Sequence, residues 1–132
     1  MQKEVFCAPT VYSPVRYVQG IKVTGGTVVW ISGQVSQDKE GKVVHKGNFS
    51  GQARQALANL KAMVEAAGGT VQDIVKVTTY LTDLRYREEL ARVRAEFFPD
   101  GKLPASTLLG VAGLADPDML VEIEAVAVLP EK

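Results

Sequence analysis

Two glutamates, Glu122 and Glu124, are the residues of this chain whose type and spacing best fit chemistry. They lie in the segment 120–128, whose apolar residues alternate with the two-residue period of a β-strand. Both carboxylates therefore share one face of that strand, and charged groups placed there must be solvated, paired or used. They could act as a general acid–base pair. They could equally form salt bridges across a subunit interface, and the residues alone leave both readings open.

The other reactive side chains suggest little further chemistry. The chain has one histidine, His45, and one cysteine, Cys7. A zinc site needs several such ligands, so we expect no metal, and no G-x-S-x-G segment supports a serine nucleophile. We expect His45 to lie in a solvated loop and Cys7 to be incidental. Tyr17 fits either a packing role over a sheet edge or one wall of a ligand pocket.

The elements that must position these residues are strands arranged around two helices. We expect residues 1–19 to be irregular, because Pro9 and Pro14 disfavour regular structure. The predicted elements, in chain order, are strands at 21–23 and 27–32, a helix from Ser50 to the Gly68-Gly69 stop, a strand at 74–81, a helix at about 85–98 capped by Asp83, and strands at 107–111 and 120–128. Strand 27–32 is apolar on both faces, which predicts a central position. In strand 74–81 we expect Val75, Val77, Thr79 and Leu81 to share one face.

This order predicts an α+β fold with one mixed sheet and both helices on the same face. A length of 132 residues predicts a single domain, 1–132. The other sheet face then needs cover, which a small domain finds most easily in copies of itself.

Charge and composition narrow the class of function. Lys plus Arg and Asp plus Glu both number 15, so no net charge attracts nucleic acid or an anionic membrane. The N-terminus is too polar for a signal peptide, and no apolar run is long enough for a transmembrane helix. We expect a cytoplasmic protein that does not bind a membrane.

Several segments, taken together in their order and spacing, are specific although none is specific alone. They are Tyr17-Val18-Gln19-Gly20, Ile31-Ser32-Gly33-Gln34, the helix 52–60, Asp73-Ile74-Val75-Lys76, the run 78–84, Pro104-Ala105 and the segment 121–127. In this combination the chain resembles the Rid family, the reactive intermediate deaminases, also called the YjgF family.

The resemblance implies a chorismate-mutase-like fold and a homotrimer. Three subunits would pack their sheets into a central barrel with the helices outside, leaving a small-ligand cleft at each subunit interface. Active members of the family hydrolyse reactive enamines and imines to 2-keto acids and ammonia without a cofactor.

The resemblance also assigns roles to residues of this chain. Glu122 matches the family glutamate that holds or activates the attacking water, which makes it the predicted catalytic residue. Tyr17 matches a tyrosine that lines the cleft, and Gly33 matches the glycine after the central strand. Leu108 falls where a backbone amide contacts the ligand.

Two departures separate this chain from the family pattern. The family motif Pro-Ala-Arg ends here at Ser106, so the arginine that grips the substrate carboxylate is absent, and a pocket asparagine falls at Ala91. The chain thus resembles the subgroup that lacks this arginine. A serine hydroxyl cannot replace a charged, bidentate contact, which predicts weak turnover of 2-imino acids unless Arg16, Arg87 or Arg92 reaches the cleft.

Three functions remain in view. The first is a deaminase with a substrate scope altered by the serine at position 106. The second is a non-catalytic trimer that binds a small metabolite or a protein partner. The third is the endoribonuclease or translation-inhibitor role sometimes attached to the family, which ranks last because the chain is neutral and has one histidine.

Overall fold

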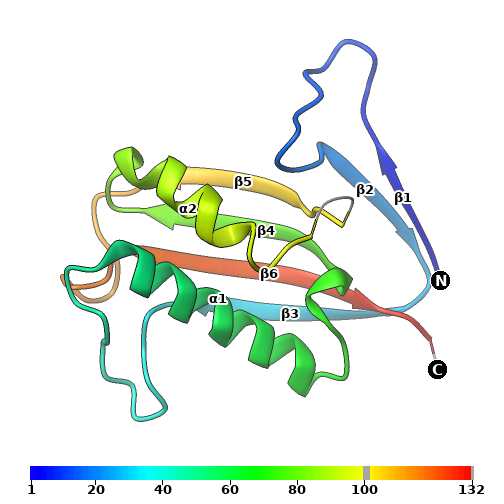
Figure 1. The fold of residues 1–132 in the computed structure, drawn as a ribbon. Helices are drawn as coiled ribbons and strands as arrows, with labels where there is room; N and C mark the ends of the chain where they lie inside the picture. The colour runs from blue at the N-terminus through cyan, green and yellow to red at the C-terminus, as the bar shows by residue number, and fades with distance from the viewer. Residues whose placement is uncertain (100–101, 132) are drawn as a thin grey trace.

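The main sheet of the protein has four strands and carries both α-helices on one face (Figure 1). The computed structural model describes residues 1–99 and 102–131. The strands lie in the order β3 (Thr27–Gln34), β6 (Val121–Leu129), β4 (Ile74–Leu81) and β5 (Ala105–Gly110). β4 and β5 are parallel and the other neighbours are antiparallel, so the sheet is mixed. The predicted α+β architecture, with two helices on one face, is confirmed.

The N-terminal segment forms a second, two-stranded sheet. β1 (Gln2–Phe6) pairs antiparallel with β2 (Gly20–Thr24), and the pair stands apart from the main sheet in Figure 1. The prediction that residues 1–19 are irregular was therefore wrong for residues 2–6 and holds for 7–19, which contain no helix or strand. The described residues form this small sheet in addition to the predicted mixed sheet. β1 is polar at three of its five positions, so its local pattern does not predict a strand. It forms a strand because it hydrogen-bonds to β2, which lies more than ten residues further along the chain.

β3 lies at one end of the main sheet, so the prediction of a central strand was wrong. Its only neighbour in the four-strand order is β6, yet Val28 and Trp30 are exposed on the face opposite the helices. Both faces of β3 are therefore apolar for a different reason than a central position in the sheet. Its outward face is apolar although nothing within the subunit covers it.

The inner strands alternate as expected, with one local correction. Val121 and Ile123 of β6 are buried on the helix side. In β4 an irregularity in the pairing between Ile74 and Lys76 turns Ile74 toward the core, and Val75 is only partly buried. The prediction that Val75 shares the core face with Val77 was wrong, because a bulge shifts the two-residue alternation.

The two helices differ from their predicted boundaries. α1 (Phe49–Ala66) begins after Asn48, whose side chain accepts a hydrogen bond of 2.9 Å from the Gly51 amide, so Asn48 and not Ser50 is the N-cap. The left-handed Gly68, with a φ of 97°, follows the helix as predicted. The region after Asp83 is a 3₁₀ turn, η2 (Leu84–Tyr86), followed by α2 (Arg87–Arg94), which ends four residues before the predicted position 98.

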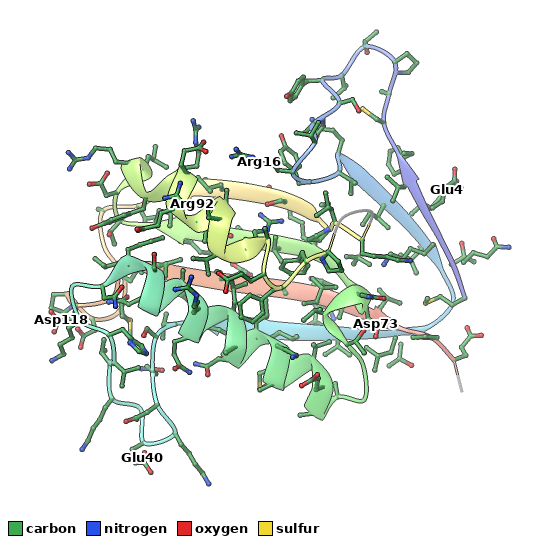
Figure 2. The ribbon with its side chains drawn as sticks, viewed as in Figure 1. Glu4, Arg16, Glu40, Asp73, Arg92 and Asp118 are labelled. Carbon is green, nitrogen blue, oxygen red and sulfur yellow. The ribbon has the colours of Figure 1, made fainter. Side chains whose placement is uncertain are left out.

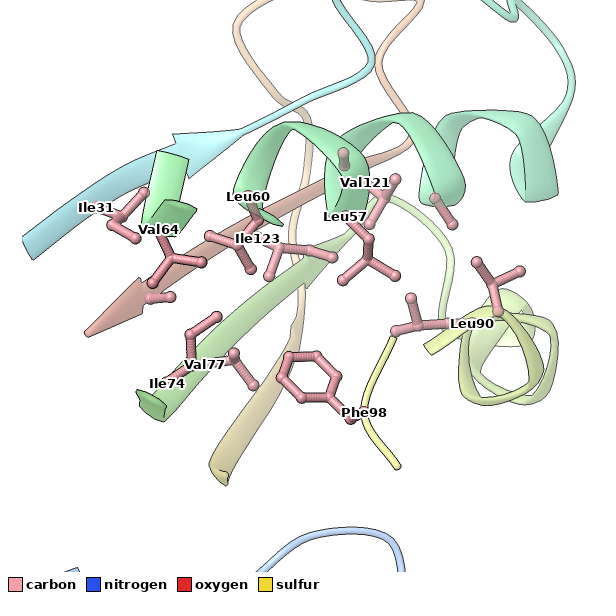
Figure 3. Close-up of a cluster of buried hydrophobic side chains, with 14 of the residues drawn as sticks. Ile31, Leu57, Leu60, Val64, Ile74, Val77, Leu90, Phe98, Val121 and Ile123 are labelled. Atoms are coloured by element: carbon pink, nitrogen blue, oxygen red, sulfur yellow. The ribbon is translucent and has the colours of Figure 1, made fainter. Parts of the chain in front are cut away.

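The hydrophobic core lies between α1, α2 and the sheet. Figure 3 shows Leu57, Leu60 and Val64 of α1 against Val121 and Ile123 of β6. A second 3₁₀ turn, η1 (Val71–Asp73), leads from α1 into β4. None of the helices within 1–99 and 102–131 has the length and apolar character needed to cross a membrane.

Candidate functional site

The open face of β6 carries the two glutamates, as the alternation predicted. Glu122 and Glu124 are partly buried there and have Tyr80 and Thr78 of β4 as their cross-strand partners. The Tyr80 hydroxyl donates a hydrogen bond to the Glu124 carboxylate. That hydrogen bond is the main cause of a raised Tyr80 pKa, together with burial and the charges of Glu124 and Glu122. Glu124 is thus engaged within the subunit.

Glu122 lies directly against the backbone of Gly33. A Cβ atom built on Gly33 would be 1.8 Å from Glu122 Oε2, so only glycine leaves room for the carboxylate in this position. The pairing of β3 with β6 is irregular between Ile31 and Gln34, which is where Gly33 lies. Among the described residues, the Glu122 carboxylate has no hydrogen-bond partner comparable to the Tyr80 partner of Glu124.

The start of β6 is anchored from the helix side by Gln52, a fully buried side chain of α1. Its Nε2 donates to the Asp118 carbonyl at 2.8 Å, and its Oε1 accepts from the Leu120 amide at 2.9 Å. These bonds hold both ends of the turn into β6. They therefore fix the position of the strand on which Glu122 lies.

A pocket of about 680 Å³ lies on the other side of the sheet, a volume typical of small-ligand sites. It is bounded by α2, by the helix-side residues of β5 and by the segment before β2. Its lining residues are Tyr12, Pro14, Val15, Arg16, Tyr17, Arg87, Glu88, Leu90, Ala91, Arg94, Ser106 and Leu108. It contains three predicted site residues, Tyr17, Ser106 and Leu108, and also Ala91.

The predicted site residues fall into two groups on opposite faces of the sheet. Ser106 and Leu108 pair with Val77 and Thr79, which are buried on the helix side. Glu122 lies on the open side with Gly33. Within one subunit the structure therefore brings the pocket residues together and brings Glu122 to Gly33, but it does not join the two groups.

The arginines of the pocket differ from those expected. Arg16 and Arg87 line it, whereas Arg92 is not among its lining residues in the described part of the chain. Figure 2 labels Arg16 on the segment leading into β2 and Arg92 on α2. Arg16 is held by Glu88 through two contacts, of 3.3 Å and 3.2 Å. The hydrogen bond from Arg16 is the largest cause of a lowered Glu88 pKa.

Sequence reasoning missed Arg94, the last residue of α2. Its Nη1 donates to Ser106 Oγ at 3.0 Å, and its guanidinium carbon lies 5.5 Å from the centre of the Phe98 ring. Its Nη2 is buried without a hydrogen-bond partner among the described residues, and burial lowers the pKa of the group. The available signal was helical spacing, because Arg94 follows the buried Leu90 by four residues.

The pocket is suited to an anion. Three arginines line it against one glutamate, so its lining carries a positive balance although the whole chain is neutral. Within the described ranges, no group of three His, Cys, Asp or Glu side chains gathers where a metal ion could be held.

Comparison with known proteins places this fold and pocket in a class and then in a family. The class is that of YjgF-like α+β proteins, in which two helices pack on one face of a mixed sheet. The model of the family described as Endoribonuclease L-PSP matches residues 8–129. The chain belongs to this family, which includes the YjgF, Rid and RutC proteins.

Individual relatives are similar to this chain in sequence or structure over most of its length. A RutC family protein of Pyrococcus horikoshii is 41% identical over 127 residues, which cover 95% of this chain and 97% of the relative. A Rid family protein of unknown function from Yersinia pestis has a TM-score of 0.85 at 30% identity, covering 98% of this chain and all of its own. RidA from an Antarctic Psychrobacter has a TM-score of 0.72 at 36% identity, covering 86% and 88% of the two chains. The predicted family is confirmed, and the subgroup without the arginine stays a prediction.

Proposed function

We propose that the protein is a cofactor-independent imine and enamine hydrolase of the Rid type, active as a homotrimer. In this proposal the pocket of one subunit is completed by Glu122 and Gly33 of its neighbour. The observation that carries the proposal is the division of the site, since each subunit holds the ligand pocket on one sheet face and the free carboxylate on the other.

The uncovered sheet face supports assembly. Trp30 is 79% exposed and Val28 is 50% exposed, both on the face opposite the helices. Large apolar side chains in such positions are typical of an interface between subunits. For Glu122 to complete the pocket, the β5 end of one subunit, which carries Ser106 and Leu108, would lie beside the open face of the next subunit.

The chemistry assigns one step to Glu122. Its carboxylate takes a proton from a water molecule whose oxygen forms a bond to the imine carbon. As that bond forms, the carbon–nitrogen double bond becomes a single bond and the nitrogen takes the proton held by Glu122. The new hydroxyl then gives up its own proton, which passes through the same carboxylate to the nitrogen as the carbon–nitrogen single bond breaks, and a keto acid and ammonia leave. Tyr17 and the backbone at Leu108 would position the substrate, and Gly33 would leave space for the carboxylate.

The test is turnover of 2-iminopropanoate generated in situ, followed by keto acid and ammonia formation. Glu122→Gln keeps the shape of the side chain and removes its basicity, so turnover should fall about 100-fold or more. Glu124→Gln is the matched control on the same strand face and should retain most activity. Absence of turnover by the wild type, beside an active arginine-containing relative, would refute the proposed function.

A binding function is the second candidate, favoured by Ser106 in place of the family arginine. Ligand-dependent thermal shifts without turnover across several imino substrates would support it.

An endoribonuclease function, which the family description names, ranks below both. His45 is exposed in a loop and does not line the pocket. RNA cleavage by protein free of contaminating nuclease would support the endoribonuclease function.

A further inference from the structure

Arg94 and Ser106 meet in the pocket at the position where the family motif places an arginine. We infer that Arg94, held by Ser106, is the anion-binding group of this pocket and grips the carboxylate of a small 2-imino or 2-keto acid. The inference rests on the proposed function for the class of ligand. It identifies an arginine that reaches position 106 from α2 instead of being carried by β5 itself.

The hydrogen bonding of Arg94 leaves one buried donor unpaired. Nη1 is used by Ser106 Oγ at 3.0 Å, whereas Nη2 is buried and lacks a partner among the described residues. A buried charged donor without an acceptor costs more than an ordinary missing hydrogen bond. A ligand carboxylate that displaces a neighbouring side chain and reaches Nη2 removes that cost. The Ser106 hydroxyl, which accepts from Arg94, keeps its own proton to donate to a second oxygen.

The surroundings of Arg94 hold the guanidinium in one place. Leu90 and Val93 on the same helix are 2% exposed and anchor α2 to the core. The Phe98 ring lies beside the guanidinium and adds a cation–π contact. A guanidinium fixed in this way loses little freedom when it binds, and its planar fork matches a carboxylate.

The other two arginines of the pocket are less suited to this role. Arg16 already shares two contacts with Glu88, and both of those side chains are largely exposed. Arg87 is also exposed. Arg94 is the one that is largely withdrawn from solvent, where an ionic contact is screened least. An arginine remains charged at neutral pH even when burial lowers its pKa.

This arrangement changes the expectation for restoring the family motif. An arginine at position 106 would place a second guanidinium beside Arg94 and would remove the hydroxyl that holds it. Ser106→Arg alone should therefore weaken carboxylate binding, because the larger side chain displaces Arg94 and fills the space beside it. Ser106→Arg combined with Arg94→Met should bind carboxylate again, because one guanidinium then occupies the site.

The experiment compares two ligands of nearly equal shape by titration calorimetry on the whole protein. Pyruvate carries a carboxylate, and pyruvamide replaces it with a neutral amide. The wild type should prefer pyruvate by about tenfold or more, in keeping with a charged hydrogen-bonded contact. Arg94→Met should lower pyruvate affinity by about tenfold and leave pyruvamide binding unchanged. Arg92→Met, on the same helix but outside the pocket lining, is the matched control and should bind pyruvate as the wild type does.

Three results would overturn the inference. They are equal binding of pyruvate and pyruvamide by the wild type, retained pyruvate affinity in folded Arg94→Met, and improved binding in Ser106→Arg alone. The wild-type ligand comparison needs no variant, so the test stands even if Arg94→Met is unstable. Glu122→Gln separates this inference from the proposed function, because it should lower turnover about 100-fold or more while pyruvate still binds.

Discussion

At the scale of single residues, the contact between Gly33 and Glu122 has the sharpest consequence. The nearest atoms to a Cβ at Gly33 all belong to the Glu122 side chain. An alanine there can be accommodated only if this carboxylate turns away from its place. Gly33 does not have a left-handed backbone, so alanine causes no backbone strain there. The substitution therefore tests only the steric contact with Glu122.

Gly33→Ala should therefore reduce turnover nearly as much as Glu122→Gln, about 100-fold, with a smaller effect on thermal stability. The measurements are keto acid formation and a thermal melt. Gly113→Ala is the control, because a Cβ at Gly113 meets nothing within 4 Å. Unchanged turnover in Gly33→Ala would show that the position of Glu122 against Gly33 does not matter for catalysis.

Tyr80 makes a second prediction at this scale, concerning pH. Its pKa is raised chiefly by the hydrogen bond to Glu124, so Tyr80 should ionise above the ordinary tyrosine value of about 10. A group with a raised pKa in the folded state adds stability that is fully present below the unfolded pKa. That stability is lost as the pH rises through the folded pKa.

Phenolate absorbance, compared between the wild type and Tyr80→Phe, reports the Tyr80 titration. Glu124→Gln removes the charge that faces the hydroxyl and should return the Tyr80 pKa toward its ordinary range. If the titration is the same with and without Glu124, the hydrogen bond is not its cause.

At the scale of elements, the start of α1 tests which residue caps the helix. Asn48 has an extended backbone and accepts from the Gly51 amide. Asn48→Ala should lower the free energy of unfolding by about 1 kcal/mol, the usual cost of losing such a cap. Ser50→Ala should change it by a few tenths of a kcal/mol at most, since Ser50 lies inside the helix. Chemical denaturation measures both, and a larger loss in Ser50→Ala would reverse the assignment.

At the scale of the whole molecule, the exposed face of β3 bears on assembly. Trp30 projects from this face with most of its surface in solvent. If the face packs against copies of the chain, Trp30→Glu places a charge in an apolar interface and should dissociate the assembly. Sedimentation velocity should show a trimer of the 14.2 kDa chain for the wild type and smaller species for the variant.

Met63→Glu is the control for this experiment. Met63 is also an exposed apolar residue, but it lies on α1 at the opposite side of the sheet. It should leave the trimer intact. A monomeric wild type would remove the interface from the proposed site, because Glu122 and the pocket could then not come together.

Patterns with a short range in sequence were predictable from the chain alone. The alternation in the last strand placed Glu122 and Glu124 on one face, and helical spacing located α1. Both depend on the geometry of one element, which repeats every 2.0 or 3.6 residues. The order of strands and helices likewise predicted the α+β fold, since two apolar helix stripes need one sheet face to bury them.

Only the tertiary structure decided where these elements meet. β1 acquires its order from pairing with β2, and β3 lies at the end of the sheet although both of its faces are apolar. The division of Glu122 from Ser106 follows from strand register, which a linear sequence does not display. Sequence analysis missed Arg94 as a candidate binding residue, because its role depends on the contact with Ser106, twelve residues away in the chain. Sequence determines what each element can present on its faces, and packing determines which of those faces become a site.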